Sequence, residues 1–155
     1  MKQAKRSVRA LSVTTAIVIG AAPLAISSTT GTDAIKARQE TMEGIGDAME
    51  GLAAIAKKEK PFDPAVVSKN AETIASHFRT AATLFPEGSH QGEVETWAKT
   101  EVWSDRETFD DTLESAEKAA VALQSVSEEA AFRPALAKLG ENCKSCHEMF
   151  RRPKE

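Results

Sequence analysis

Three reactive side chains lie close together near the end of this chain, in the segment Cys143-Lys144-Ser145-Cys146-His147. On an α-helix, residues three and four positions apart share one face, so Cys143, Cys146 and His147 would project to the same side. No other cysteine occurs among the 155 residues. The spacing therefore favours a helix whose one face carries two thiols and an imidazole.

This pattern has the CxxCH form of a c-type haem attachment site. Two thiols on one face can add to the two vinyl groups along one edge of a haem, and the adjacent imidazole then reaches under the ring to the iron. One haem accounts for both cysteines. We therefore predict one covalent haem c, attached through Cys143 and Cys146, with His147 as the proximal iron ligand.

Two other interpretations fit the same three residues. A CxxC pair can form a redox disulfide, but that motif normally opens a helix just after a strand, and this chain shows no convincing strand. Two cysteines and one histidine can form part of a zinc site, but a structural site needs a fourth ligand and usually wider spacing. Both stay open on these residues alone, and the motif favours covalent haem.

The first 27 residues have the features of an export signal. They begin with four basic residues, Lys2, Lys5, Arg6 and Arg9. An apolar stretch at 10–22 follows and is short for a membrane span, and small residues near 25–28 offer cleavage sites. We expect a cleaved signal peptide at 1–27 and a periplasmic mature domain at 28–155 with no membrane span. A retained membrane anchor is the alternative.

Charge restricts the partners of the mature domain. The chain has 20 basic and 23 acidic residues, and four of the basic ones lie in the expected signal, which leaves a net charge of −7. An acidic surface argues against nucleic acid and against anionic lipid as partners. The remaining 128 residues are enough for one domain with one core.

The composition favours helices, because tyrosine is absent and aromatic residues make up only 5% of the chain. Apolar residues recur every three or four positions in four segments. These run from about 33 to 58, from 63 to about 85, from 104 to about 126, and from about 127 to 150. They predict an all-α fold, an antiparallel four-helix bundle with the cofactor held between helices near the C-terminal helix.

Local signals indicate where several of these helices begin and end. Asp63 can cap the second helix with Pro64 at its first position, and Phe85-Pro86 ends it. Ser104-Asp105-Arg106-Glu107 predicts a capping box for the third helix. Pro134 fits the fourth helix only in about its first turn.

The chain also resembles the class II c-type cytochromes, which comprise the cytochrome c prime family and its low-spin c-556 branch. Their CxxCH lies close to the C-terminus on the last helix, whereas the more common small c-type cytochromes attach haem near the N-terminus. Similar segments follow the family's order along nearly all of the mature chain, at 35–42, 85–89, 102–105 and 140–151. Residues 99–103 lack a proline that the family often has, and Trp97 is unusual at its position.

The resemblance implies roles for individual residues. Arg38 matches the family arginine beside a haem propionate, and Gln39 next to it would line the same pocket. Arg151 matches a basic residue one turn after the proximal histidine. Trp103 matches an aromatic position that packs near the haem or in the core.

Met42 matches the family's distal position, over the haem face opposite His147. If its sulfur binds the iron, the site is six-coordinate and suits electron transfer, because little rearranges when the electron moves. If Met42 only crowds that face, the iron is five-coordinate and open to nitric oxide or carbon monoxide. We predict Met42 as the distal ligand. His77, His90 and Met49 are weaker candidates.

These observations predict a periplasmic mono-haem electron carrier, without catalysis of its own, that works with periplasmic redox proteins. The alternative is a five-coordinate haem protein that binds a small gas. A haem peroxidase would need a distal acid–base pair, and Arg38 is the only histidine or arginine on the expected distal face. The resemblance also allows a homodimer through the first two helices.

Overall fold

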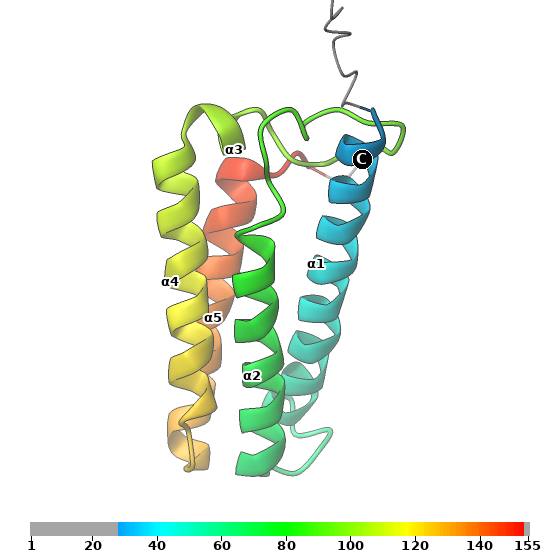
Figure 1. The fold of residues 1–155 in the computed structure, drawn as a ribbon. Helices are drawn as coiled ribbons and strands as arrows, with labels where there is room; N and C mark the ends of the chain where they lie inside the picture. The colour runs from blue at the N-terminus through cyan, green and yellow to red at the C-terminus, as the bar shows by residue number, and fades with distance from the viewer. Residues whose placement is uncertain (1–27, 154–155) are drawn as a thin grey trace, which may run out of the picture.

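The computed structural model describes residues 28–153. Five helices follow one another in this part of the chain: α1 (Ser28–Ala56), α2 (Pro64–Ala81), α3 (Glu101–Ser104), α4 (Arg106–Gln124) and α5 (Glu129–Phe150). The four long helices run alternately down and up, so the expected antiparallel four-helix bundle is confirmed (Figure 1). The predicted signal peptide at 1–27 lies outside the described residues.

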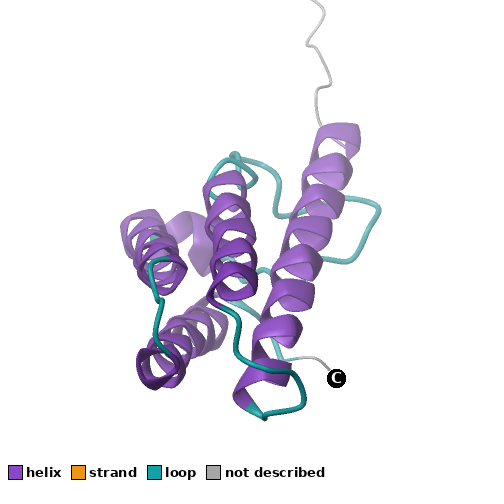
Figure 2. Cartoon of the chain, turned by 90° about the horizontal axis from the view of Figure 1, so that it is seen from below, coloured by secondary structure: helices purple, strands orange, loops and turns teal. Residues whose placement is uncertain are grey.

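The long helices pack in a chain of neighbours. α1 packs on α2, α2 packs on α4, and α4 packs on α5, whereas α1 and α5 contact each other only sparsely. Viewed from the lower end, α1 stands on the far side of α2 from α4 and α5 (Figure 2). The loop between α2 and α3, residues 82–100, crosses the upper end of the bundle to α1 and back (Figure 1). This arrangement leaves room between α1 and α5 at that end.

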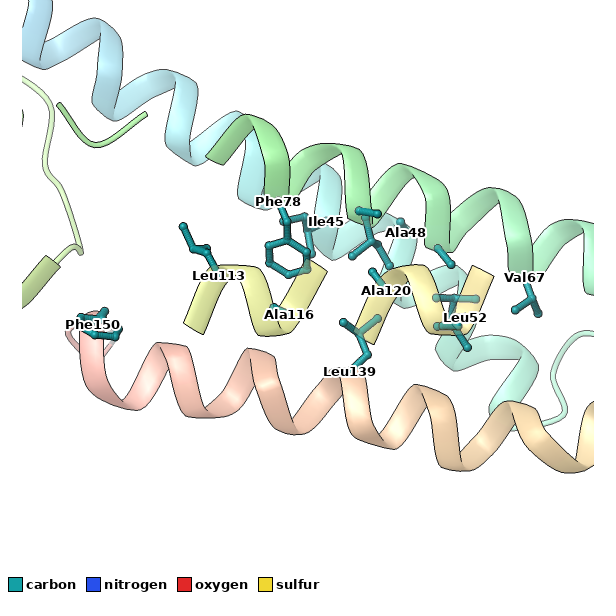
Figure 3. Close-up of a cluster of buried hydrophobic side chains, with 14 of the residues drawn as sticks. Ile45, Ala48, Leu52, Val67, Phe78, Leu113, Ala116, Ala120, Leu139 and Phe150 are labelled. Atoms are coloured by element: carbon teal, nitrogen blue, oxygen red, sulfur yellow. The ribbon is translucent and has the colours of Figure 1, made fainter. Parts of the chain in front are cut away.

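The core follows the apolar periodicity of the helices. The inward faces of α2 and α4 contribute a continuous row of buried side chains: Val67, Ala71, Ile74, Phe78, Phe109, Leu113, Ala116, Ala120 and Leu123. Leu52 from α1 and Leu139 from α5 are fully buried against this row (Figure 3). Each such leucine contributes about 1.5–3 kcal/mol by leaving water. The hydrophobic core extends up to Phe109 and Phe150, which also line the cavity described below.

The start of α2 follows the sequence prediction, and its end does not. Asp63 accepts a 2.8 Å hydrogen bond from the N–H of Ala65, and Pro64 occupies the first helical position. The helix stops at Ala81 and not near 85. Beyond Ala81 the N–H groups of Thr83 and Leu84 bond the carbonyl oxygens three positions back, and Pro86 has no N–H for the carbonyl of Ala82. Arg106 donates to the carbonyl oxygens of Phe85 and Ala82 at 2.9 and 3.3 Å in this non-helical segment.

The predicted capping box at 104–107 is wrong. Ser104 is the last residue of the short helix α3, whose backbone closes with a 2.9 Å bond from the N–H of Asp105 to the oxygen of Glu101. α4 then begins at Arg106, and the side chain of Asp105 makes no capping bond. Pro134 is the sixth residue of α5, slightly deeper than the first turn. None of the helices within 28–153 has the length and apolar character needed to cross a membrane.

Candidate functional site

A cavity of about 480 Å³ lies at the upper end of the bundle. Its walls come from α1, from the last turn of α5, from the first turns of α3 and α4, and from the loop at 82–100. The apolar part of the wall includes Ile35, Met42, Phe85, Val102, Phe109 and Phe150. The volume falls within the range of roughly 300–1,000 Å³ that is typical of cofactor and ligand sites.

Five of the six predicted site residues line this one cavity. Arg38, Gln39 and Met42 line it from α1, and Cys146 and His147 line it from α5. Helical spacing accounts for the α1 part of this group, since Arg38 and Gln39 lie four and three positions before Met42. The sixth residue, Cys143, lies one turn earlier on α5, where it is half-buried and packs against the core.

The surroundings of the three motif residues hold them in neutral forms. Cys143 and Cys146 form no disulfide with each other. Burial raises the pKa of the Cys143 thiol, and burial followed by the charge of Cys143 raises the pKa of Cys146 to about 11. Burial lowers the pKa of His147, and the nearby charge of Arg151 adds to this effect. A neutral imidazole keeps the lone pair that a metal ligand needs.

Arg38 is a buried cation on the cavity wall. Its Nη2 donates to the carbonyl oxygen of Ser89 at 2.7 Å, and its Nη1 donates to the Ser89 hydroxyl at 3.3 Å. The guanidinium lies 4.7 Å from the ring centroid of Phe85 and 5.6 Å from that of Trp103. Burial lowers its pKa to about 10. No carboxylate of residues 28–153 forms an ion pair with it.

This lack of a counter-charge bears on the fit of a haem. A buried guanidinium is costly unless an anion pairs with it. A haem carries two propionates, and a haem in this cavity would bring that anion to Arg38. The residues present therefore fit the group on three counts: an apolar wall, an imidazole with a thiol on one helix, and an unpaired buried cation.

Trp103 does not line the cavity. Its Nε1 donates to the carbonyl oxygen of Pro86 at 3.0 Å, and its ring supports Arg38 from outside. Of the weaker candidates for the distal position, His77 packs beside Gly44 where α1 crosses α2, and His90 is exposed with its ring 5.6 Å from that of Trp103. Met49 packs against the core. Met42 is thus the one thioether on the described cavity wall.

Sequence reasoning missed a segment that closes the cavity. Residues 95–99, which we call the strap, run beside the end of α5, and Thr96, Trp97 and Ala98 line the cavity. The N–H of Lys99 donates to the oxygen of Phe150 at 2.9 Å, and the N–H of Arg152 donates to the oxygen of Trp97 at 2.8 Å. The unusual Trp97 was the only signal of the strap in the sequence.

The strap is also tied through side chains. Gln39 on α1 donates from Nε2 to the carbonyl oxygen of Glu95 at 2.9 Å. The guanidinium of Arg152 donates to the carbonyl oxygen of Thr96 and lies 3.6 Å from the Glu95 carboxylate. The strap therefore joins α1 to the end of α5 across the mouth of the cavity.

The structural context disfavours the two other interpretations of the motif. Cys143 and Cys146 lie in the last third of α5, whereas a thiol redox motif opens its helix. Within residues 28–153, no three histidine, cysteine or acidic side chains are grouped closely enough to hold a metal ion among themselves. A structural zinc site would need such a group.

Comparison with known proteins agrees with the geometry. The family model described as Cytochrome C' matches residues 33–151. The cytochrome c' of Rhodopseudomonas palustris is 36% identical over 124 residues, which cover 79% of this chain and 84% of that one. The cytochrome c-556 of Agrobacterium fabrum is 34% identical over 122 residues, which cover 76% and 80% of the two chains.

Solved structures show the same fold. The cytochrome c' of Rhodopseudomonas palustris superposes with a TM-score of 0.75 and 35% identity, covering 79% of this chain and 98% of that one. The nitric oxide complex of a cytochrome c prime variant from Alcaligenes xylosoxidans has a TM-score of 0.72 at 23% identity, covering 80% and 97%, and this likeness concerns the fold alone. Taken with the family model and the sequence relatives, these structures show that the chain belongs to the cytochrome c' family of proteins with covalently attached haem c.

Proposed function

We propose that this protein is a periplasmic electron carrier whose haem iron lies between His147 and Met42. The observation that carries the proposal is that one cavity is lined by a thioether from α1 and by an imidazole from α5. Bound haem supplies an iron that changes oxidation state by one electron, and a methionine–histidine ligand pair raises its reduction potential. In this proposal Cys143 and Cys146 hold the haem through thioether bonds.

The remaining wall residues prepare the cavity for this task. Arg38 would pair with a propionate, and its bonds to Ser89 hold the guanidinium in place. Gln39 would line the pocket while its amide holds the strap through Glu95. The apolar part of the wall would lower the polarity around the metal, which tunes its reduction potential.

A gas-binding, five-coordinate site is the second candidate. It stays a candidate because the cytochrome c' and the cytochrome c-556 reported above are nearly equally similar to the chain, and this similarity supports five-coordinate iron as well as six-coordinate iron. We assign no enzymatic role. The polar side chains that α1 adds to the described wall are Arg38, Gln39 and Glu43, and they include no histidine to form a peroxidase-type acid–base pair.

Spectroscopy of the purified holoprotein tests the ligand assignment. The reduced protein should be low-spin and should not respond to carbon monoxide. Met42→Ala should be high-spin and bind carbon monoxide, because the sulfur that fills the sixth position is gone. Met49→Ala is the matched control, a methionine two turns further along α1 that packs against the core, and it should remain low-spin.

Two outcomes contradict the assignment in different ways. A high-spin unmutated protein that binds carbon monoxide would replace the carrier proposal with the gas-binding one. A Met42→Ala variant that stays low-spin would show that another side chain is the ligand, and His77 is the first to examine.

The periplasmic location rests on the signal-like residues 1–27. Osmotic shock of cells that express the full chain should release the haem protein with the periplasmic fraction. N-terminal sequencing should then begin near Ser28. A full-length chain retained in the membrane fraction would contradict both the cleavage and the location.

A further inference from the structure

A second cavity, of about 470 Å³, opens on the surface beside the first. We call it the basic groove, and it is lined by Lys99, Lys144, His147, Glu148, Arg151, Arg152 and Pro153. His147 and Arg151 line both cavities. The side chain proposed to bind the iron therefore borders both the basic groove and the first cavity, which we call the haem cavity.

The charge of the basic groove is opposite to that of the chain around it. Its lining holds four cations and one carboxylate, so its net charge is +3. The whole sequence after position 27 has 16 basic and 23 acidic residues, so its net charge is −7. A local concentration of one sign in a chain of the other sign creates a directed field near that surface.

Neighbouring carboxylates neutralise these cations only weakly. The Nζ of Lys144 lies 3.7 Å from Glu148, and Arg152 lies 3.6 Å from Glu95. All four side chains are more than half exposed, and such surface pairs contribute little. The Nζ of Lys99 donates to the backbone oxygen of Glu148 at 2.8 Å, which adds no negative charge.

The backbone holds the groove in shape. Its residues come from the strap and from the end of α5, about fifty positions apart, and two backbone hydrogen bonds join these segments: Lys99 to Phe150 and Arg152 to Trp97. An isolated bridge between Ala98 and Arg151 lies between them. The cations are therefore presented from a paired backbone and not from separate loose ends.

We propose that the basic groove is the docking site for the acidic surface of a redox protein that exchanges electrons with this cytochrome. The proposal rests on electron transfer as the function, and it adds where the partner binds and what charge the partner carries. Complementary charge raises the rate of encounter and fixes the orientation of the partners. A partner seated here meets the molecule at His147, on the wall of the haem cavity.

Small charged oxidants test the field of the groove. The reduced holoprotein is mixed by stopped flow with hexacyanoferrate(III), an anion, and with tris(phenanthroline)cobalt(III), a cation. Ionic strength is raised from about 0.01 M to about 0.15 M, over which the Debye length falls from ~30 Å to ~8 Å. We expect the rate constant with the anion to fall about tenfold, although the net charge alone predicts a rise.

Matched variants locate the effect. Lys99→Glu and Lys144→Glu, each made singly, should weaken the salt dependence with the anion, and the double variant should reverse its sign. Lys57→Glu with Lys60→Glu changes the net charge equally, in the turn between α1 and α2 at the opposite end of the bundle (Figure 1), and should leave the sign unchanged. A rate that rises with salt in the unmutated protein would overturn the proposal.

Inhibition by polyglutamate distinguishes a groove that binds an acidic macromolecule from one that binds only small anions. In the unmutated protein, polyglutamate should inhibit oxidation by hexacyanoferrate(III) more strongly than sodium chloride or phosphate does at equal ionic strength. In the Lys99→Glu, Lys144→Glu variant, this additional inhibition should be lost. Inhibition no greater than that of the salts would show that the groove takes small anions only. Oxidation by these reagents can be measured for five-coordinate and six-coordinate iron alike. A wrong assignment of Met42 as ligand would therefore not produce the result that contradicts the docking site.

Discussion

Arg38 donates a 2.7 Å hydrogen bond from Nη2 to the backbone carbonyl oxygen of Ser89, 51 residues further along the chain. The Ser89 hydroxyl accepts from Nη1 at 3.3 Å and itself donates to the oxygen of Pro86 at 2.7 Å. The same guanidinium lines the haem cavity. One side chain thus ties the loop to α1 and places a buried positive charge on the cavity wall.

Replacing Arg38 should therefore affect both stability and redox properties. Arg38→Ala should retain its helical circular dichroism while its free energy of unfolding falls by about 1–3 kcal/mol, because the hydrogen bonds to Ser89 are lost. Its reduction potential should become lower, since a nearby cation disfavours the more positive oxidised iron. Denaturant titration and redox titration measure the two effects.

Arg79→Ala is the control for Arg38. Arg79 forms an exposed ion pair with Glu117 at 2.9 Å, and losing such a pair costs about 1 kcal/mol or less without moving the potential. An Arg38→Ala variant whose potential matches that of the unmutated protein would limit Arg38 to a structural role.

Both motif cysteines should be needed for full covalent attachment of the haem. They are the only thiols in the chain, and they lie one turn apart on α5. The Cys143→Ala, Cys146→Ala double variant should lose the haem-stained protein band on a denaturing gel, whereas the unmutated protein keeps it. Stain that persists at the band of the double variant would contradict the attachment sites.

Two glycines on α1 should respond in opposite ways to the same substitution. A methyl group at Gly44 would lie 2.6 Å from Nε2 of His77 on α2, whereas one at Gly46 meets nothing within 4 Å. Gly46→Ala should stabilise the protein by about 0.5–1 kcal/mol through helix propensity. Gly44→Ala should be less stable than Gly46→Ala by about 1–3 kcal/mol, because the imidazole must move.

Thermal or denaturant unfolding measures this difference, and a second substitution tests its cause. Adding His77→Ala to Gly44→Ala should remove most of the gap between the two glycine variants. Equal stability of Gly44→Ala and Gly46→Ala would mean that the imidazole moves aside freely and does not set the spacing of α1 and α2.

The strap should loosen when its side-chain tie is removed. Arg152 donates to the oxygen of Thr96, lies near Glu95, and stacks 5.8 Å from the ring centroid of Trp97. Arg152→Ala should lower the hydrogen-exchange protection of the Lys99 amide about tenfold, which corresponds to roughly 1.4 kcal/mol of local opening. Arg133→Ala, an exposed position near the start of α5, should leave that amide unchanged.

Unchanged protection of the Lys99 amide in Arg152→Ala would show that the backbone bonds hold the strap without the side chain. Amides in the middle of α4 serve as an internal reference, because they report opening of the whole bundle and not of the strap.

Helical periodicity predicted much of this molecule, because the relevant interactions are local. Asp63 and Pro64 mark the start of α2 through bonds within one turn, and the structure has the helix begin there. The four-residue spacing of Arg38 and Met42 puts both on one face of α1, and this face lines one cavity together with Cys146 and His147 of α5. Their roles toward the haem stay predictions.

The features that were not predicted depend on residues far apart in the sequence. The segment just past α2 is held by Arg106, more than twenty positions away, which donates to the carbonyl oxygens of Ala82 and Phe85. The strap exists because backbone groups at 97–99 pair with those at 150–152. Ser104 failed as a cap because one turn of helix forms before it. Sequence patterns among neighbouring residues cannot predict pairings between segments that lie this far apart in the chain.

The sparse contact between α1 and α5 has a consequence for folding cooperativity. α1 is coupled to the rest of the bundle mainly through α2, and at its upper half it faces the haem cavity and not another helix. In the proposed site, a haem held by α5 and facing α1 would take the place of a packing partner there and link the first helix to the last. Without haem, α1 forms the outermost layer of the bundle, and its N-terminal half is the segment that should unfold first.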